Sequence, residues 1–281
     1  MRDDFAVFIL SHGRANKVKT LKMLDKIGYT GKTYIIIDDE DEQEPIYRTL
    51  KCTGVIKFCK EAEMKITDTA DNFNDHKLVV YARNKCHDIA KELKLNYFLV
   101  LDDDYDSLDF RYVAKDGTFK AKTVKNANKL FEDTIEFLEV SGALTVAYAQ
   151  AGDFIGGANN NYYKQVLRKA MNSFFCKTDR PFKFSGSTNE DVNMYVTYGN
   201  KGYKIFTISK MSIVQTMTQQ NSGGLTDIYL QNGTYIKSFY SVIHQPQAVM
   251  VAPMGGTHKR IHHKINWNKC TPKILNEKYK K

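Results

Sequence analysis

The sequence is poor in cysteine and has no long hydrophobic run. Its five cysteines are an odd number and include no CxxC pair, so neither a disulfide framework nor a cysteine-based zinc site is expected. No apolar stretch approaches the roughly 20 residues of a membrane helix. The N-terminus has neither the basic start nor the small-residue cleavage site of an export signal. These absences predict a soluble, cytoplasmic protein that does not enter a membrane.

Glycine-rich phosphate-binding motifs are also missing. Neither GxxxxGKS/T nor GxGxxG occurs, so a P-loop or a dinucleotide fingerprint cannot account for a nucleotide site. The chain has a net charge of +9 and a pI near 9.1, which favours an acidic partner such as nucleic acid, nucleotide or anionic lipid. Basic residues concentrate in 115–129 and 257–281. Solvated surface lysine would give the same pattern.

An apolar run at 97–101 ends in three consecutive carboxylates, Asp102, Asp103 and Asp104. Its length and its aromatic and β-branched content predict a strand that is buried on both faces. Clustered acid at the end of such a strand needs a compensating cation. Because side chains alternate along a strand, Asp102 and Asp104 should point to one side and Asp103 to the other. Hard oxygen ligands favour Mg²⁺ or Mn²⁺; the alternative is a solvated acidic turn.

With 281 residues and 42% hydrophobic content, the chain can bury a sizeable core. Apolar periodicity predicts strands at 5–10, 33–37, 54–58, 97–101 and 174–176, and helices at 21–27, 75–93 and 125–140. This order favours an α/β fold with a mostly parallel central sheet between helices. Ligands of such sheets bind beyond the carboxyl ends of the strands, where three polar clusters fall: Ser11–Arg14, Asp38–Asp39 and Asp102–Asp104.

A second pair of acids, Glu190 and Asp191, stands where a helix should begin. Thr188 or Asn189 could cap this helix, and the helix dipole favours acid in its first turn. A carboxylate at this position could instead remove a proton from an acceptor hydroxyl, as a general base does. Both interpretations stay open from the residues alone.

The order of these motifs over residues 5–265 resembles a GT-A fold glycosyltransferase. The matching elements are Ser11 and Arg14, Asp38 and Asp39, Ala82-Arg83-Asn84, Asp102-Asp103-Asp104 and Glu190-Asp191. More narrowly, the chain is similar to the phage and eukaryotic TET/JBP-associated glycosyltransferases, which attach sugars to hydroxymethylated pyrimidines in DNA. The resemblance implies a Rossmann-like, mostly parallel sheet with helices on both faces and a C-terminal extension on the acceptor side. For a phage enzyme, the compartment would be the host cytoplasm.

The resemblance also implies roles for individual residues. The nucleotide-sugar site, for a UDP-sugar donor, would be formed by Ser11, Arg14, Asp38, Asp39, Arg83, Asp102 and Asp103. Asp104, together with Asp102, would hold Mn²⁺ or Mg²⁺. A late histidine would complete the metal shell, and the candidates are His244, His258, His262 and His263. Asp191, beside Glu190, would be the catalytic base of an inverting transfer.

The acceptor is expected to be DNA, with 5-hydroxymethylcytosine or 5-hydroxymethyluracil as the modified base. Reaching a base inside a duplex requires base flipping, with aromatic side chains that receive the base and cations that grip phosphates. Aromatic candidates are Tyr162, Tyr163, Phe174, Phe175, Tyr229, Tyr235, Tyr240 and Trp267, although such residues more often belong to a core. Rival hypotheses are a glycan, lipid-linked or protein acceptor, and a catalytically silent nucleic-acid-binding module.

The chain is expected to contain three regions with different roles. Residues 1–110 would bind the nucleotide sugar, residues 111–250 would form the acceptor-binding half of the same domain, and the basic tail 251–281 would complete the metal and substrate site. The donor sugar, the anomeric outcome and the oligomeric state stay open.

Overall fold

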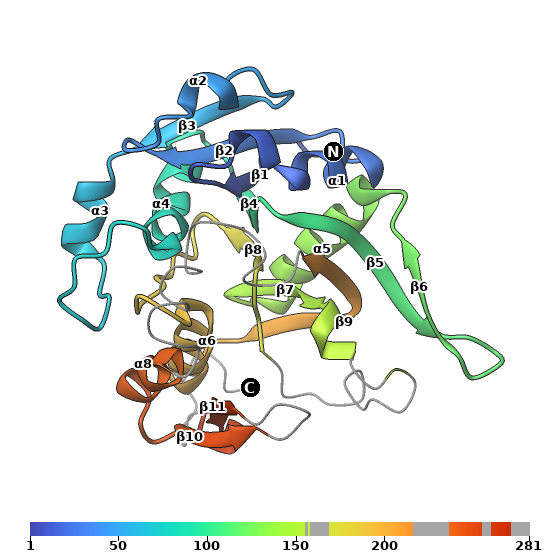
Figure 1. Cartoon of the computed structure of the whole chain (residues 1–281). Helices are drawn as coiled ribbons and strands as arrows, with labels where there is room; N and C mark the ends of the chain where they lie inside the picture. Colours follow the sequence, from blue (N-terminus) through green and yellow to red (C-terminus); the bar gives the residue numbers. More distant parts are fainter. Residues whose placement is uncertain (155–156, 158–168, 216–235, 255–259, 271–281) are drawn as a thin grey trace.

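The computed structural model describes residues 1–154, 157, 169–215, 236–254 and 260–270. These residues form a mixed nine-stranded sheet, helices that cover both of its faces, and a separate two-stranded sheet (Figure 1). The strand order of the large sheet is β3 (Gly54–Phe58), β2 (Lys32–Asp38), β1 (Phe5–Leu10), β4 (Tyr97–Asp102), β8 (Ser173–Lys177), β7 (Thr145–Gln150), β9 (Ile205–Gln215), β5 (Tyr105–Val113) and β6 (Phe119–Thr123).

The N-terminal part of the sheet is parallel, as the sequence predicted. β1 pairs in parallel with β2 and with β4, and β2 pairs in parallel with β3. In the rest of the sheet, among the described strands, the one parallel pair is β7 with β9. β8, β5 and β6 pair antiparallel with their neighbours. The antiparallel pairing of β5 with β6 follows from their short connection, because β6 begins only six residues after the end of β5 and a parallel pairing needs a crossover of a dozen or more residues.

Helices cover the sheet on two sides. The described α-helices are α1 (Lys19–Lys26), α2 (Glu44–Tyr47), α3 (Lys60–Ile66), α4 (Val79–Glu92), α5 (Ala127–Ser141), α6 (Glu190–Asn200) and α8 (Ile236–His244). The described residues also form the short 3-10 helices η1 (Ala15–Lys17), η2 (Ala151–Phe154) and η5 (Trp267–Lys269). The small sheet pairs β10 (Val249–Met254) with β11 (Arg260–Ile265), and α8 contacts both of its strands and α6.

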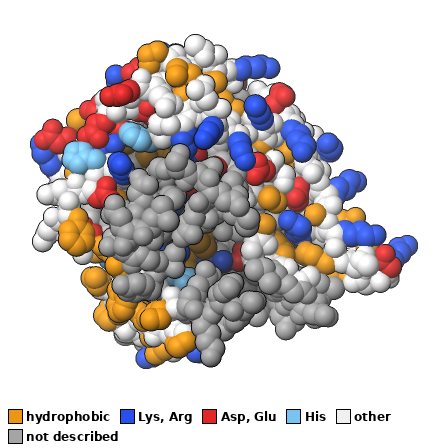
Figure 2. All heavy atoms as spheres, viewed as in Figure 1, with side chains coloured by type: hydrophobic (Ala, Val, Ile, Leu, Met, Phe, Trp, Pro, Cys, Tyr) orange, Lys and Arg blue, Asp and Glu red, His pale blue; other side chains and the backbone are white. Residues whose placement is uncertain are grey.

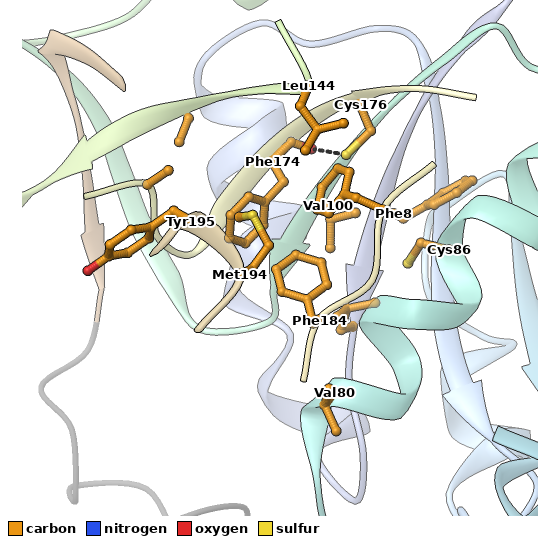
Figure 3. Packing of buried hydrophobic residues seen from close by; sticks show 14 of the residues in the cluster. Phe8, Val80, Cys86, Val100, Leu144, Phe174, Cys176, Phe184, Met194 and Tyr195 are labelled. Atoms are coloured by element: carbon orange, nitrogen blue, oxygen red, sulfur yellow. Dashed lines mark hydrogen bonds between the residues drawn. The ribbon is translucent and has the colours of Figure 1, made fainter. Parts of the chain in front are cut away.

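Alternation along β1 divides the core into two layers. Phe5, Val7 and Ile9 face the side covered by α1 and α5, whereas Phe8 and Leu10 face the side covered by α4 and α6. Every residue of β1 is buried, which explains why its sequence is a continuous apolar run and not an alternating one. Figure 3 shows the second layer, where side chains from α4, β4, β8 and α6 pack together around Phe174 and Phe184.

The predicted strands and helices of the N-terminal part are confirmed within a few residues, although α4 begins at Val79 and not at residue 75. The hairpin β5–β6, strand β9 and the α8–β10–β11 unit were not predicted. None of the helices in the described ranges is both long and apolar enough to cross a lipid bilayer.

Candidate functional site

The turn that follows β1 is held by the segment that follows β2. The backbone N–H of Gly13 donates to Asp41 Oδ2 at 2.9 Å, that of Arg14 donates to Tyr47 Oη at 3.0 Å, and that of Ala15 donates to Gln43 Oε1 at 2.8 Å. Gly13 has a φ of 65°, a conformation that L side chains rarely adopt. The loops that follow the neighbouring parallel strands β1 and β2 are therefore held together by hydrogen bonds. Neither Gln43 nor Tyr47 stands out in the sequence as a site residue.

Asp103 binds this turn. Ser11 Oγ donates to Asp103 Oδ2 at 2.5 Å, and Arg14 Nη1 lies 3.3 Å from Asp103 Oδ1. Burial raises the pKa of Asp103, and the bonds from Ser11 and Arg14 only partly oppose the shift. Three of the predicted nucleotide-sugar residues are thus brought together by direct contacts.

The turn between β4 and β5 is fixed by the first residues of α1. Thr20 Oγ1 donates to Asp102 O at 2.6 Å and accepts from the N–H of Tyr105 at 3.1 Å, and the Thr20 N–H donates to Asp103 O at 3.2 Å. Thr20 is completely buried. It was missed because a lone threonine in a lysine-rich helix gives no signal in a single sequence.

This turn corrects the predicted alternation of the three aspartates. β4 ends at Asp102, so the two-residue period does not extend to the next residues. Asp103 and Asp104 both line a pocket of about 160 Å³, whereas Asp102 does not. The other residues of the pocket wall are Gly13, Arg14, Asn16, Lys17, Lys19 and Gln43. The pocket therefore combines two carboxylates with three cationic side chains at the carboxyl ends of β1 and β4.

The chemistry of Asp104 fits a bound cation. Burial, followed by the nearby carboxylate of Asp102, raises the pKa of Asp104 to about 6, and a hydrogen bond from Gln215 Nε2 at 3.3 Å partly opposes the shift. A positive ion beside these oxygens would favour the ionised form. Carboxylates of this kind are suitable ligands for Mg²⁺ or Mn²⁺.

Arg83 joins the two acidic clusters. Its side chain is 3% exposed; Nη2 lies 3.2 Å from Asp102 Oδ1, and Nη1 donates to Glu190 Oε1. The guanidinium also lies over the rings of Phe174 and Phe184, 5.5 and 5.6 Å from their centroids. Burial opposes the charge on Arg83, but Asp102 and Glu190 outweigh it and raise the pKa. The side chain predicted to meet the base or the diphosphate is thus engaged by two carboxylates inside the protein.

The next residue of the same motif, Asn84, holds the chain that leads to α6. Its Oδ1 accepts from the Phe184 N–H at 2.8 Å, and its Nδ2 donates to Phe184 O at 3.0 Å. Because Arg83 and Asn84 are neighbours on α4, one helix fixes both Glu190 and the segment before it. The Ala-Arg-Asn motif therefore positions the second acidic pair relative to the first.

Glu190 and Asp191 begin α6, as predicted, and both are buried. Burial raises the pKa of each carboxyl, and Arg83 pulls both in the opposite direction. Asp191 Oδ1 accepts from the N–H of Val192 at 2.7 Å. The predicted side-chain cap is wrong: Asn189 has a left-handed φ of 54° and makes no side-chain cap bond. Its Nδ2 donates instead to Lys237 O at 2.8 Å.

Asp38 and Asp39 lie at the end of β2. Asp38 is buried between Lys60 Nζ at 2.9 Å and His12 Nδ1 at 2.8 Å. Burial raises its pKa, but the bonds from His12 and Lys60 outweigh burial, so the net shift is downward. Asp39 is exposed, and its Oδ1 accepts from the N–H of Lys60 at the start of α3. These contacts fix the turn; the ligand roles predicted for both aspartates stay predictions.

One late histidine lies close to the second acidic pair. His263 on β11 lies with Nδ1 3.3 Å from Nδ2 of Asn189, the residue before Glu190. Burial and nearby positive groups lower the pKa of His263 to about 3. His262 is its neighbour on the strand, His244 ends α8, and His258 lies outside the described residues. Within the described part of the chain, no three His, Cys, Asp or Glu side chains form a group that could hold a metal ion.

Two of the four described aromatic candidates for receiving a base belong to the interior, and the other two are partly buried. Phe174 and Phe175 are completely buried. Trp267 stacks on Tyr195 of α6 with ring centroids 5.8 Å apart, and Tyr240 Oη donates to Asp71 Oδ2 at 2.7 Å. The remaining candidates, Tyr162, Tyr163, Tyr229 and Tyr235, lie outside the described residues.

The protein has an α/β fold in which a pocket of carboxylates and cations lies at the carboxyl ends of parallel strands. This is where α/β proteins commonly bind their ligands. The family model described as TET-Associated Glycosyltransferase matches residues 5–224, which is most of the chain. The chain belongs to this family and is therefore a glycosyltransferase, an enzyme that takes a sugar from a donor to an acceptor. None of the curated proteins with which it was compared matches it.

Proposed function

We propose that this enzyme has a GT-A fold and transfers the sugar of a UDP-sugar to the hydroxymethyl group of a modified pyrimidine in DNA. The observation that supports the proposal most directly is the buried Arg83, which ties the acid at the end of β4 to the acid at the start of α6. The acids at the end of β4 serve the donor, and the acids at the start of α6 serve the acceptor. The family name points to DNA modification, and the net charge of +9 suits a polyanionic acceptor.

The donor occupies the pocket beside Asp103 and Asp104. Arg14, Lys17 and Lys19 line this pocket and stabilise the negative charge that collects on the leaving diphosphate. Asp104, with Asp102 behind the pocket wall, would hold Mn²⁺ or Mg²⁺, and the ion would supply further positive charge to the leaving diphosphate. The parallel strands β3–β2–β1–β4 support a nucleotide-binding half of the GT-A type.

The acceptor hydroxyl is activated by Asp191, and transfer inverts the anomeric carbon. The acceptor oxygen forms a bond to that carbon, the bond from the carbon to the phosphate oxygen breaks with its electron pair leaving on UDP, and Asp191 takes the hydroxyl proton. Burial raises the pKa of Asp191, which makes its carboxylate a better proton acceptor. Glu190 is bonded to Arg83, and the N–H of Val192 holds the carboxylate of Asp191.

The test is a screen of UDP-glucose, UDP-galactose and UDP-N-acetylglucosamine against DNA that contains 5-hydroxymethylcytosine or 5-hydroxymethyluracil. Mass spectrometry should find one hexose or N-acetylhexosamine added per modified base, with Mn²⁺ present and not with chelator. Unmodified DNA of the same sequence is the control. UDP binding without any transfer to either DNA would favour a glycan, lipid-linked or protein acceptor, and DNA binding without UDP binding would favour a non-catalytic module.

A further inference from the structure

The β5–β6 hairpin continues past the large sheet as a two-stranded ribbon. β9 pairs with β5 only as far as Phe110, which lies opposite Met211, whereas β6 pairs with β5 out to Val113, opposite Phe119. The connecting loop is closed by the Ala114 N–H, which donates to Thr118 O at 2.8 Å. Figure 1 shows the hairpin projecting from the right-hand side of the molecule.

One face of this ribbon combines aromatic rings with lysines. Phe110 lies opposite Lys122, and Tyr112 lies opposite Lys120. Directly opposite residues of an antiparallel pair share a face of the sheet, so these four side chains form one surface. The two rings stack with centroids 5.9 Å apart, Phe110 is 40% exposed, and both lysines are exposed. This surface offers apolar area flanked by positive charge.

The other face of the ribbon is already used for packing. The Arg111 guanidinium lies 5.5 Å from the ring centroid of Phe154, and Phe119 stacks on the same ring at 5.6 Å. These contacts anchor the ribbon to η2. The face that carries Lys120 and Lys122 lies on the opposite side from these contacts and is the one considered for a partner.

The basic surface continues from the ribbon to the donor pocket along α1. This helix contacts β5, and Lys19 Nζ lies 3.1 Å from Asp106 Oδ1. Lys17 and Lys19 line the pocket, and Lys22 is exposed on the same helix. Figure 2 shows Lys and Arg side chains gathered over α1, β5 and β6. Positive charge thus leads from the tip of the ribbon to the site.

We propose that α1 and the β5–β6 ribbon bind the phosphate backbone of duplex DNA, with Lys120 and Lys122 on phosphates and the Phe110–Tyr112 pair against sugar or base surface. A two-stranded ribbon fits the major groove of B-form DNA, which is about 12 Å wide. The inference deepens the proposed function, because it assigns the surface that holds the DNA acceptor. Binding of UDP does not depend on it.

The experiment measures fluorescence anisotropy of an unmodified duplex of about 20 base pairs with the full chain at several salt concentrations. Each lost lysine–phosphate contact should make the slope of log Kobs against log salt shallower by about 1, so K120Q/K122Q should lower it by about 2. The matched control, K51Q/K91Q, removes the same charge from exposed positions beside β3 and on α4 and should bind like the wild type.

A further variant, F110A, should weaken binding without changing the slope, because contact with a ring releases no counterions. Equal affinity and slope for wild type and K120Q/K122Q would overturn the inference. In that case the lysines only keep the edge strand β6 from pairing with other chains, and their loss would increase self-association. UDP binding in the presence of Mn²⁺, measured on the same samples, separates this outcome from failure of the proposed function, since K120Q/K122Q should keep it.

Discussion

Replacement of Arg83 by methionine tests whether its guanidinium holds the two acidic clusters together. The native side chain is 3% exposed and lies between the carboxylates of Asp102 and Glu190. Methionine keeps apolar volume against Phe174 and Phe184 but removes the charge, which leaves Glu190 buried without its cation. Loss of one partner of a buried ion pair costs about 3–5 kcal/mol. We expect R83M to lose about this much free energy of unfolding at pH 8.

The free energy of unfolding that R83M loses should be smaller at acidic pH. Burial raises the pKa of Glu190 even in the presence of Arg83, which lowers it, so R83M raises the pKa further. Between the ordinary value near 4.5 and the raised native value, the folded state binds more protons than the unfolded state. Stability therefore falls as pH rises through this window. R83M should be closer to the wild type at pH 5 than at pH 8.

Urea unfolding followed by circular dichroism at both pH values measures these differences. R83M/E190Q removes both charges and should recover much of the loss, because Asp102 is partly exposed and stays hydrated. R48M removes an exposed arginine that pairs with Glu44 and should have little effect. The reasoning is refuted if R83M unfolds at the same urea concentration as R48M, or if its loss is the same at pH 5 and pH 8.

Four further predictions concern the site. D104N should abolish metal-dependent UDP binding in calorimetry. UDP binding by the wild type should strengthen as pH rises through about 6, because Asp104 ionises there. The cation assignment is contradicted if UDP binding is the same in D104N and does not depend on pH. D191N should stop sugar transfer with donor affinity nearly intact, and a normal transfer rate would exclude Asp191 as the base. T20V removes the side-chain bonds of the β4–β5 turn and should cost about 1–3 kcal/mol in urea unfolding, whereas T49V, at an exposed threonine, should cost much less. G13A finds open space for its Cβ but a φ of 65°, so it should lower stability by about 1 kcal/mol from backbone strain alone, and an unchanged midpoint would argue against that strain.

The sequence predicted the parallel half of the sheet because β1, β2 and β4 carry strong local patterns. Their residues are buried on both faces, so they appear as continuous apolar runs bounded by polar turns. The hairpin β5–β6 gives no such pattern. β6 reads Phe-Lys-Ala-Lys-Thr and lies exposed at the sheet edge, where packing does not demand apolar residues. An edge strand that faces water is therefore hard to distinguish from a basic loop.

The sequence predicted that several polar residues lie close together, but it did not predict most of the contacts that hold them. Ser11, Arg14 and Asp103 converge as expected, because the carboxyl ends of parallel strands share one edge. Arg83 was assigned to the donor, since its partner Glu190 is 107 residues further along the chain and only the folded sheet brings the two together. Thr20 and Tyr47 act through hydrogen bonds to backbone and side chains, which no spacing in the sequence reveals.

The ion pairs of Arg83 also bear on how this enzyme could be re-engineered. Asp102 ends the fourth strand and Glu190 opens a helix almost ninety positions later, yet one guanidinium pairs with both. A chimera that exchanged residues 1–110 with those of a relative would cut through β5 and would separate Arg83 from its partner Glu190. Donor preference should therefore be altered by substitutions in the pocket wall, and a transplanted N-terminal segment should need its own matching α6.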